Sequence, residues 1–258
     1  MTEPLLAARG IRKSFGAVEA LAGVSLTVRA GEVTCLLGDN GAGKSTLIKI
    51  LSGVLQPDSG DIRVDGKPVQ FGSARDALDR GIATVFQDLA VVPVMPIYRN
   101  FFLGREPVRG WGPFRTFAKR EAMRRAAEEI ARFGIAVDDV TRPIVTLSGG
   151  ERQSVAIARA IHFGARVLIL DEPTSALGVK ESEIVLRFVR RAKERGIGIV
   201  FITHNVHHAW LIGDSFEILK RGSVSQAFEK SALTKDQLLT EMAGGEDLER
   251  LQVVFASD

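Results

Sequence analysis

Short runs of apolar residues alternate along the chain with longer segments in which apolar positions recur at helical spacing. The runs predict β-strands at residues 24–28, 33–37, 82–86, 167–170 and 199–202. The longer segments predict helices at residues 44–52, 119–133, 150–163 and 180–195. The runs VLIL (167–170) and IVFI (199–202) are apolar throughout, which is typical of strands covered on both faces. This alternation predicts an α/β domain with a mostly parallel sheet.

The middle third of the chain departs from the alternation. From about residue 88 to 160 the pattern is helical and is interrupted by the Pro and Gly clusters VVPVMP and REPVRGWGP. We therefore expect a helical subdomain over about 88–160, inserted into a core made of about 1–87 and 161–225. A short helical tail is expected over about 231–258. The whole chain, 1–258, is then expected to be a single domain.

Composition and charge narrow the possible functions. The chain has 34 Lys and Arg against 31 Asp and Glu, and its densest cationic stretch, KREAMRR, is mixed with an acid inside a helical pattern. A solvated helix face explains that stretch better than a nucleic-acid surface does, so we expect no nucleic-acid partner.

The single cysteine, Cys35, excludes an internal disulfide, and its apolar surroundings predict a small buried side chain. No apolar run reaches the roughly 18 residues of a membrane span, and no secretory signal is visible, so we expect a cytosolic protein or the cytosolic part of something larger.

The sequence GDNGAGKST at residues 38–46 directly follows one predicted strand and leads into a predicted helix. It fits the pattern G-x-x-x-x-G-K-[ST] in the strand, loop and helix context that this pattern requires. Its glycines let the backbone fold around phosphate, and the helix N-terminus adds partial positive charge. Lys44 is expected to reach the β- and γ-phosphates of a nucleotide, and the Ser45 hydroxyl to bind Mg²⁺. The expected phosphate-binding residues are Gly38, Asp39, Asn40, Gly41, Ala42, Gly43, Lys44, Ser45 and Thr46.

Two adjacent carboxylates end the predicted strand at 167–170. Asp171 and Glu172 follow it directly, and ligands of open α/β sheets bind beyond the carboxyl ends of the strands. We expect Asp171 to hold Mg²⁺ and Glu172 to act as general base or to orient the attacking water. An acidic strand end alone is more often a solvated loop, and the phosphate loop upstream favours the functional interpretation.

Two further polar residues end strand-like runs. Gln87 follows IATVF, and His204 follows IVFIT. A glutamine at this position can contact both Mg²⁺ and the attacking water, and a neutral histidine can hydrogen-bond the γ-phosphate. A metal site made of His204, His207 and His208 is the weaker alternative, because no Cys or Glu completes it.

The string LSGGERQ at 147–153 begins another predicted helix. Ser148 is a good N-cap, and Gly149 and Gly150 leave backbone amides accessible to an anion. The string therefore resembles a second phosphate-binding segment, about a hundred residues after the first. A plain helix start is the alternative, and SGG alone would not exclude it.

In this order the motifs strongly resemble those of the ATP-binding subunits of ABC transporters. GDNGAGKST corresponds to Walker A, Gln87 to the Q-loop, LSGGERQ to the family signature, VLILDEPTSAL (167–177) to Walker B, and His204 to the switch histidine. Phe15, in KSFG, matches the aromatic residue that stacks on adenine. The resemblance covers essentially the whole chain. It implies a P-loop NTPase (RecA-like) core with an N-terminal antiparallel β part and an inserted helical subdomain.

The resemblance also implies a mechanism. Two such subunits meet head to tail, and each ATP, with Mg²⁺, lies between the phosphate loop of one and the signature of the other. The signature residues Ser148, Gly149, Gly150 and Glu151 would then contact the nucleotide of the partner. One chain carries one phosphate loop and one signature, so we expect a homodimer or a pair with a related subunit.

The resemblance further implies a membrane partner. An integral-membrane permease and a solute-binding protein belong to such systems, and residues 88–106 lie where the family contacts the permease. The chain is therefore expected at the cytoplasmic face of the cell membrane as a peripheral subunit.

Several stretches resemble the branch that serves importers of monosaccharides such as ribose, fructose and xylose. These stretches are VFQDLAVVP (85–93), FFLGRE (101–106), SALGVKES (175–182), HNVHHAW (204–210) and EMAGGEDLERL (241–251). Most family members have Asp where this chain has Gly178, in a loop that links the two ATP sites, whereas Gly is common in the sugar branch. The expected function is thus ATP hydrolysis coupled to import of a monosaccharide.

Two other functions compete with this one. A soluble ABC ATPase acting on ribosomes or DNA usually carries tandem ATP domains or a long coiled coil, and the interval from Lys44 to Ser148 has room for neither. A scaffold subunit that does not hydrolyse ATP is disfavoured by the presence of Lys44, Glu172, Gln87 and His204.

Overall fold

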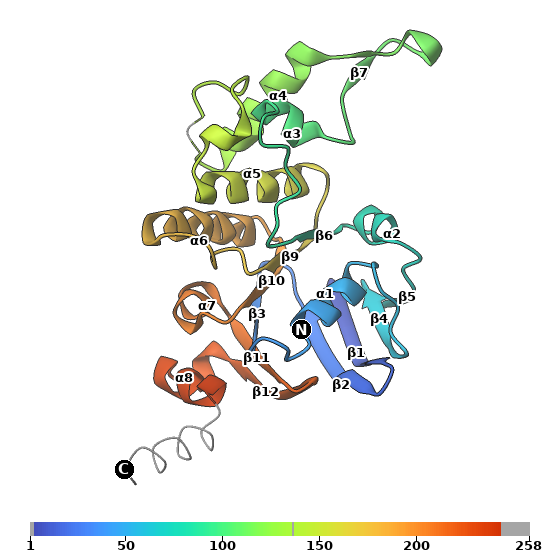
Figure 1. The fold of residues 1–258 in the computed structure, drawn as a ribbon. Coiled ribbons are helices and arrows are strands. Elements are labelled where there is room, and N and C mark those ends of the chain that lie inside the picture. Colours follow the sequence, from blue (N-terminus) through green and yellow to red (C-terminus); the bar gives the residue numbers. More distant parts are fainter. Residues whose placement is uncertain (1–2, 136, 244–258) are drawn as a thin grey trace.

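A six-stranded sheet with the strand order β12-β11-β3-β10-β9-β6 forms the centre of the fold (Figure 1). The computed structural model describes residues 3–135 and 137–243. Strands β11, β3, β10, β9 and β6 are parallel, and β12 pairs antiparallel with β11 at one edge. The strands of this sheet are β3 (Val33–Leu37), β6 (Ile82–Val85), β9 (Val167–Asp171), β10 (Gly198–Thr203), β11 (Ser215–Lys220) and β12 (Ser223–Glu229).

An antiparallel sheet of order β2-β1-β4-β5 is built from the N-terminal part of the chain. Its strands are β1 (Leu6–Phe15), β2 (Val18–Val28), β4 (Ser59–Val64) and β5 (Lys67–Val69). The tight turn between β1 and β2 pairs Phe15 with Val18 and contains Gly16 with a φ of 59°, a left-handed conformation that glycine adopts without steric cost. The predicted strand at 24–28 is the last part of β2. The expected antiparallel part is confirmed.

Both faces of the parallel strands are buried, as their continuous apolar sequences predict. On β3, Cys35 and Leu37 belong to one hydrophobic cluster and Leu36, on the opposite face, to another. Leu168 and Leu170 on β9 likewise face the first cluster and Ile169 the second. Burial raises the pKa of the Cys35 thiol, in agreement with the expected role as a small buried apolar residue.

Helices cover the two faces unequally. Apolar side chains of α1 fill the space between the antiparallel sheet and one face of the central sheet, whereas α4, α5, α6 and α7 contribute to the cluster on the other face. In Figure 1, α6 lies between α5 and the central strands. The helices are α1 (Lys44–Leu51), α2 (Ala74–Asp79), α3 (Ile97–Phe102), α4 (Lys119–Arg132), α5 (Gly149–His162), α6 (Val179–Glu194), α7 (Val206–Ile212) and α8 (Lys235–Ala243), with 3₁₀ turns at Gly112–Phe114, Ile144–Thr146 and Lys230–Ala232.

The middle of the chain is helical only in part. Helices α3, α4 and α5 contact one another, but a small hairpin of β7 (Val108–Arg109) and β8 (Thr116–Phe117) stands between α3 and α4. Gly110 and Gly112, both with positive φ, break the helical pattern here and allow the reversal. The predicted helix at 150–163 is α5, which extends slightly beyond the expected subdomain boundary at 160.

The C-terminal tail expected over about 231–258 contains the described helix α8 (Lys235–Ala243), and its remainder lies outside the described residues. Of the described helices, none has the length and the apolar character that a bilayer crossing requires. The loops after the parallel strands β3, β6, β9, β10 and β11 meet at one edge of the central sheet, because the carboxyl ends of parallel strands point the same way.

Candidate nucleotide-binding and hydrolysis site

A pocket of about 380 Å³ lies at this edge of the central sheet. Most of the expected phosphate-binding residues line it, and so do Gln87, Asp171 and Glu172 from the ends of two other strands. Within the described residues, the phosphate-loop positions in the lining are Asp39, Asn40, Gly41, Gly43, Lys44, Ser45 and Thr46. Gly38 and Ala42 belong to the same loop but are not part of the lining.

Close packing requires glycine at two positions of the phosphate loop. Gly38 has a φ of 153°, and a Cβ there would lie 2.4 Å from the Leu219 carbonyl oxygen. Gly43 has a φ of 107°, and its Cβ would lie 2.6 Å from the Ala20 carbonyl oxygen. The loop is therefore pressed against β2 and β11, and only glycine tolerates both the approach and the backbone conformation.

Lys44 begins α1 and is almost fully buried. Its ammonium group donates hydrogen bonds to the carbonyl oxygens of Gly38 at 2.5 Å and Asp39 at 3.1 Å. The positive charge is thus held inside the loop, next to the amide groups of the helix N-terminus. A buried ammonium group needs hydrogen-bond acceptors, and the carbonyl oxygens of the loop provide them.

Asp171 and Glu172 enter the pocket from the end of β9. Burial raises the pKa of Asp171, the adjacent charge of Glu172 raises it further, and the charge of Lys44 opposes both effects. Ser45, Gln87 and Asp171 line the same pocket and offer a hydroxyl, an amide and a carboxylate. Oxygen donors of these types suit Mg²⁺.

Glu172 is held by a hydrogen-bond network at the start of the loop after β10. Its backbone has a φ of 47°, an unusual conformation for a residue with a side chain. One carboxylate oxygen accepts from the His204 backbone N–H at 3.1 Å and lies 2.9 Å from Nδ1 of the same residue. The other accepts from the Thr203 hydroxyl at 3.2 Å. The structure thus joins the expected base to the expected switch histidine, although His204 itself does not line the pocket.

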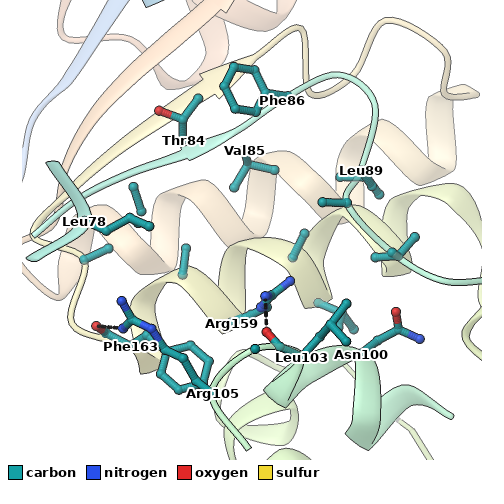
Figure 2. Close-up of a pocket in the computed structure, with 18 of the residues that line it drawn as sticks. Leu78, Thr84, Val85, Phe86, Leu89, Asn100, Leu103, Arg105, Arg159 and Phe163 are labelled. Atoms are coloured by element: carbon teal, nitrogen blue, oxygen red, sulfur yellow. Dashed lines mark hydrogen bonds between the residues drawn. The ribbon is translucent and has the colours of Figure 1, made fainter. Parts of the chain in front are cut away.

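Gln87 lies between two concave surfaces. Its side chain lines the phosphate pocket, whereas its neighbours Phe86 and Asp88 line a second, apolar pocket of about 370 Å³ (Figure 2). That second pocket lies between the end of β6, the segment leading to α3, and one face of α5, and we call it the β6–α5 groove. Its other labelled lining residues are Leu78, Thr84, Val85, Leu89, Asn100, Leu103, Arg105, Arg159 and Phe163.

Polar groups hold the β6–α5 groove in shape. Arg159 on α5 donates to the Leu103 carbonyl oxygen at 2.7 Å, and Asn100 exchanges hydrogen bonds with the backbone of Val92 and also donates to Met95. Arg105 donates to the Phe163 carbonyl and lies over the Phe163 ring (Figure 2). These bonds fix the irregular segment after Gln87 against α5.

The signature residues lie apart from this pocket. Ser148 caps α5 by accepting from the Glu151 N–H at 3.3 Å, and the Glu151 carboxylate accepts in return from the Ser148 N–H at 2.8 Å. None of Ser148, Gly149, Gly150 and Glu151 belongs to the described lining of the phosphate pocket. Helix α5 packs on α3, α4 and α6, whereas α1 packs on β2 and β9.

The two glycines of the signature have a packing role that the sequence analysis did not foresee. A Cβ on Gly150 would lie 2.5 Å from the Glu181 carbonyl oxygen, so α6 begins in direct contact with the start of α5. The Glu181 carboxylate also accepts from the Gly149 N–H at 3.0 Å and from the Gly178 N–H at 3.2 Å. The Gly149 amide therefore already has an internal anionic partner, which corrects the expectation that both amides are open.

Five lining residues were missed from the sequence. Val18, Glu19 and Ala20 come from β2, and Arg221 and Gly222 from the turn between β11 and β12. The only signal for the turn was its Arg-Gly pair, and nothing in the β2 sequence marks a pocket. Phe15 is half exposed at the end of β1, opposite the lining residue Val18, and is not itself in the lining.

His208 makes a structural contact outside the pocket. His208 lies with Nδ1 2.9 Å from the Thr174 hydroxyl, and burial together with the neighbouring His207 lowers its pKa. Among the described residues there is no group of three or more His, Cys, Asp or Glu side chains that could hold a metal ion.

Comparison with known proteins identifies the family. The model of the ABC transporter family matches residues 21–175, more than half of the chain. The chain belongs to the ABC transporter family. Membership makes it an ATP-binding cassette and an ABC-type ATPase.

Curated relatives of the cassette are named as sugar import proteins. The xylose/arabinose import ATP-binding protein XylG of Sulfolobus acidocaldarius is 46% identical over 85% of this chain and 86% of its own length. The fructose import ATP-binding protein FrcA of Rhizobium meliloti is 44% identical over 85% of this chain and 86% of its own length. The ribose import ATP-binding protein RbsA of Rhodopirellula baltica is 43% identical over 92% of this chain, which spans 46% of that longer protein. The comparisons give no support to a role on ribosomes or DNA.

Solved structures share the fold of the cassette. The ADP conformation of the ABC transporter cassette MJ1267 matches with a TM-score of 0.81 at 25% identity, over 96% of this chain and 98% of that one. A dimeric, post-hydrolysis structure of the cassette MJ0796 bound to ADP and Pi matches with a TM-score of 0.72 at 26% identity, over 87% of this chain and 98% of that one. The P-loop NTPase fold expected from the sequence is confirmed.

Proposed function

We propose that this cassette is the ATP-hydrolysing subunit of an importer for a monosaccharide. The observation that carries the proposal is the convergence of the phosphate loop, Gln87, Asp171 and Glu172 on one pocket. The relatives named as xylose/arabinose, fructose and ribose import proteins support the sugar class of the cargo.

In the proposed reaction, Lys44 and the loop amides hold the β- and γ-phosphates of ATP. Glu172 orients the attacking water and accepts its proton, and the Thr203 and His204 contacts fix the direction of its carboxylate. Ser45, Gln87 and Asp171 would hold Mg²⁺, which supplies charge neutralisation at the phosphates when bound. Val18 lines the pocket, and Phe15, half exposed opposite it at the end of β1, would offer an apolar face to the adenine.

We further propose that ATP is bound between two copies of the chain. The signature residues are capped and ordered in one chain but do not line its own phosphate pocket. A head-to-tail homodimer would bring Ser148 and its helix N-terminus to the nucleotide held by the partner's phosphate loop. The dimeric structure of the similar cassette MJ0796 supports this arrangement.

The β6–α5 groove is the proposed docking site for the permease. Its floor is apolar, it includes the segment that follows Gln87, and the same stretch of chain lines the phosphate pocket. A membrane partner seated in the groove would therefore contact Phe86 and Asp88, which flank Gln87 on both sides. This contact would place the subunit at the cytoplasmic face of the cell membrane, in a system with a solute-binding protein.

We also propose the division of the chain that the sequence suggests. Residues of about 1–87 and 161–225 would form the nucleotide-binding core, and about 88–160 the helical subdomain that contacts the permease. The contacts of α3 and α4 with each other and with α5 support this division, whereas α5 packs most extensively on α6 of the core.

The test is the substitution Glu172→Gln. The amide keeps the size of the side chain but cannot accept the proton, so we expect ATP binding to persist, turnover to fall by about 10²-fold or more, and an ATP-bound dimer to accumulate. Steady-state hydrolysis, nucleotide binding and size-exclusion chromatography with ATP and Mg²⁺ measure the three effects. Glu183→Gln on the exposed part of α6 is the matched control. Rapid hydrolysis by the Glu172 variant would remove Glu172 from its role.

Purification of the same variant from solubilised native membranes tests the partners. A co-purifying polytopic membrane protein supports the importer, and a sugar-binding protein from the same system identifies the cargo. Co-purification with ribosomes or DNA and no permease would contradict the proposal.

A further inference from the structure

The hairpin of β7 and β8 projects from the helical part of the molecule (Figure 1). Two exposed aromatic side chains lie between its two strands in the sequence. Trp111 is 82% exposed and Phe114 is 77% exposed. Large aromatic side chains at this level of exposure on a folded element, and not singly but as a pair, indicate an interaction surface. We call residues 107–120 the projecting hairpin.

The projecting hairpin is also strongly basic. Between Pro107 and Arg120 the sequence contains four cationic residues and no Asp or Glu. All four cationic side chains are exposed, and none of them forms an ion pair within the described part of the chain. They are Arg109, Arg115, Lys119 and Arg120. By contrast, Arg124 and Arg125 on the following turns of α4 pair with glutamates.

The tip of the hairpin is exposed although its backbone is folded and hydrogen-bonded. The two short strands pair Val108 with Phe117, and the Phe114 N–H donates to the Trp111 carbonyl oxygen at 3.2 Å. At the base, Phe117 stacks on Tyr98 with ring centroids 6.2 Å apart. The hairpin is thus anchored to α3, and its backbone holds the two aromatic residues away from the body of the protein.

The projecting hairpin continues directly from the β6–α5 groove. Leu103, Gly104 and Arg105 line the groove, and the first strand of the hairpin begins at Val108. If a permease occupies the groove, as proposed above, the hairpin starts within a few residues of a protein embedded in the bilayer. In this respect the inference rests on the proposed function.

We propose that the projecting hairpin binds the anionic surface of the membrane. Trp111, whose ring carries an N–H donor, would lie in the headgroup region, where such amphipathic rings are favoured, and the apolar ring of Phe114 would reach the boundary of the acyl chains. The four cations would attract acidic phospholipids, and their long aliphatic stems allow the charges to reach the phosphates while the rings sit deeper. The permease would then be one of two membrane contacts of the subunit.

The chemistry of the surface favours lipid over a protein partner. Specific protein interfaces of stable complexes bury about 800 Å² on each side around a packed centre, whereas this tip offers two rings on a narrow hairpin. Arg109 and Arg115 lie on either side of the tip in the sequence, Lys119 and Arg120 begin α4 at its base, and none of the four has an acidic partner among the described residues. A fluid layer of phosphate groups satisfies such a diffuse arrangement without shape complementarity.

The protein contains only two tryptophans, which provides a direct reporter. Trp210 is half-buried and stacks on Phe216, so the substitution Trp210→Phe leaves Trp111 as the only source of tryptophan emission. We expect a blue shift of this emission with vesicles of equal parts phosphatidylglycerol and phosphatidylcholine, and none with phosphatidylcholine alone. Added salt should reverse the shift, because the attraction is between exposed charges.

Vesicle sedimentation of the full chain measures the contribution of each feature. The pair Arg109→Gln and Arg115→Gln should lower the partition coefficient roughly tenfold or more. The pair Trp111→Ser and Phe114→Ser should lower it by a similar factor. The matched control is the pair Arg124→Gln and Arg187→Gln, which removes the same charge from paired, exposed positions on α4 and α6. It should leave binding within about twofold of the parent.

Several outcomes would overturn the proposal: no blue shift with anionic vesicles, equal binding to zwitterionic vesicles, or an equal loss in the control pair. A photoreactive side chain at position 111 that crosslinks to the permease and not to lipid in native membranes would also overturn it and assign the hairpin to a protein contact. Vesicle binding is measured without ATP. ATPase activity and the Glu172→Gln dimer therefore test the proposed function separately.

Discussion

At the residue scale, the site depends on backbone positions as much as on side-chain chemistry. Glu172 adopts a left-handed conformation, and its carboxylate is fixed from two sides by Thr203 and His204. Unusual backbone conformations of this kind persist where the surroundings determine them, often at functional sites. At the signature, Gly150 is required by the approach of α6, whereas at Gly178 the φ of −67° is open to any residue. The Gly at 178 therefore has no conformational cause in this structure.

The contact between α5 and α6 makes a prediction for the two signature glycines. Gly150→Ala would press a methyl group against the Glu181 backbone, so we expect the free energy of unfolding to fall by about 1–3 kcal/mol. A Cβ at Gly149 would lie 2.5 Å from the end of the flexible Leu177 side chain and 3.4 Å from the nearer oxygen of the Glu181 carboxylate, both of which can move, so Gly149→Ala should cost less. Urea unfolding of both variants gives the comparison. If Gly149→Ala lowered the free energy of unfolding more than Gly150→Ala does, the close approach of the Glu181 backbone to Gly150 would not be the contact that limits packing between α5 and α6.

At the element scale, the sequence predicted what local patterns determine. Continuous apolar runs identified β3, β9 and β10, because these strands are buried on both faces, and the phosphate loop was identified by its position between β3 and α1. The hairpin of β7 and β8 was not predicted, since its strands are two residues long and carry no periodicity. The contribution of Arg221 and Gly222 to the pocket was not predictable either, because it depends on how β11 lies beside β3.

Strand β11 also carries a buried acid that the proposed mechanism does not use. Glu217 faces the antiparallel sheet, and one of its carboxylate oxygens has no hydrogen-bond partner among the described residues. Burial raises the pKa of Glu217 to about 7, and the Thr27 backbone N–H opposes this shift. Because the pKa is higher in the folded state than in the unfolded chain, the native protein holds this proton more tightly. The stabilising effect of the proton bound to Glu217 is complete below about pH 4.5 and is lost as the pH rises through 7.

The substitution Glu217→Gln tests this pH dependence. The amide stays neutral, so we expect the variant to be more stable than the parent at pH 8, by up to about 3 kcal/mol, with a much smaller difference at pH 5. Urea unfolding at both pH values measures the change, and Glu183→Gln at an exposed site is the control. A difference between parent and variant that is the same at pH 5 and pH 8 would contradict the assignment.

At the scale of the whole molecule, the separation of the signature from the phosphate pocket is the central feature. The pocket is formed by β2, the strand ends of the central sheet and α1, whereas the signature begins α5, which packs on α6 (Figure 1). The Glu181 carboxylate joins the start of α5 to the loop that follows Asp171 and Glu172. In the proposed head-to-tail dimer these two segments would serve different nucleotides, and the Glu181 hydrogen bonds would connect the two sites within each chain.

Complementation between two inactive chains tests the head-to-tail dimer. Lys44→Ala removes the cation of the phosphate loop, and Ser148→Asp keeps an N-cap on α5 but opposes the partner's phosphate with a negative charge. Alone, each variant places one defect in both sites of its dimer, so we expect little turnover. In a mixed dimer both defects fall in one site and the other is intact, so an equimolar mixture should recover up to about a quarter of the parental ATPase rate. If each chain instead completed its own site, mixing would leave the rate at the sum of the two separate variants, because no exchange of signatures could repair either pocket.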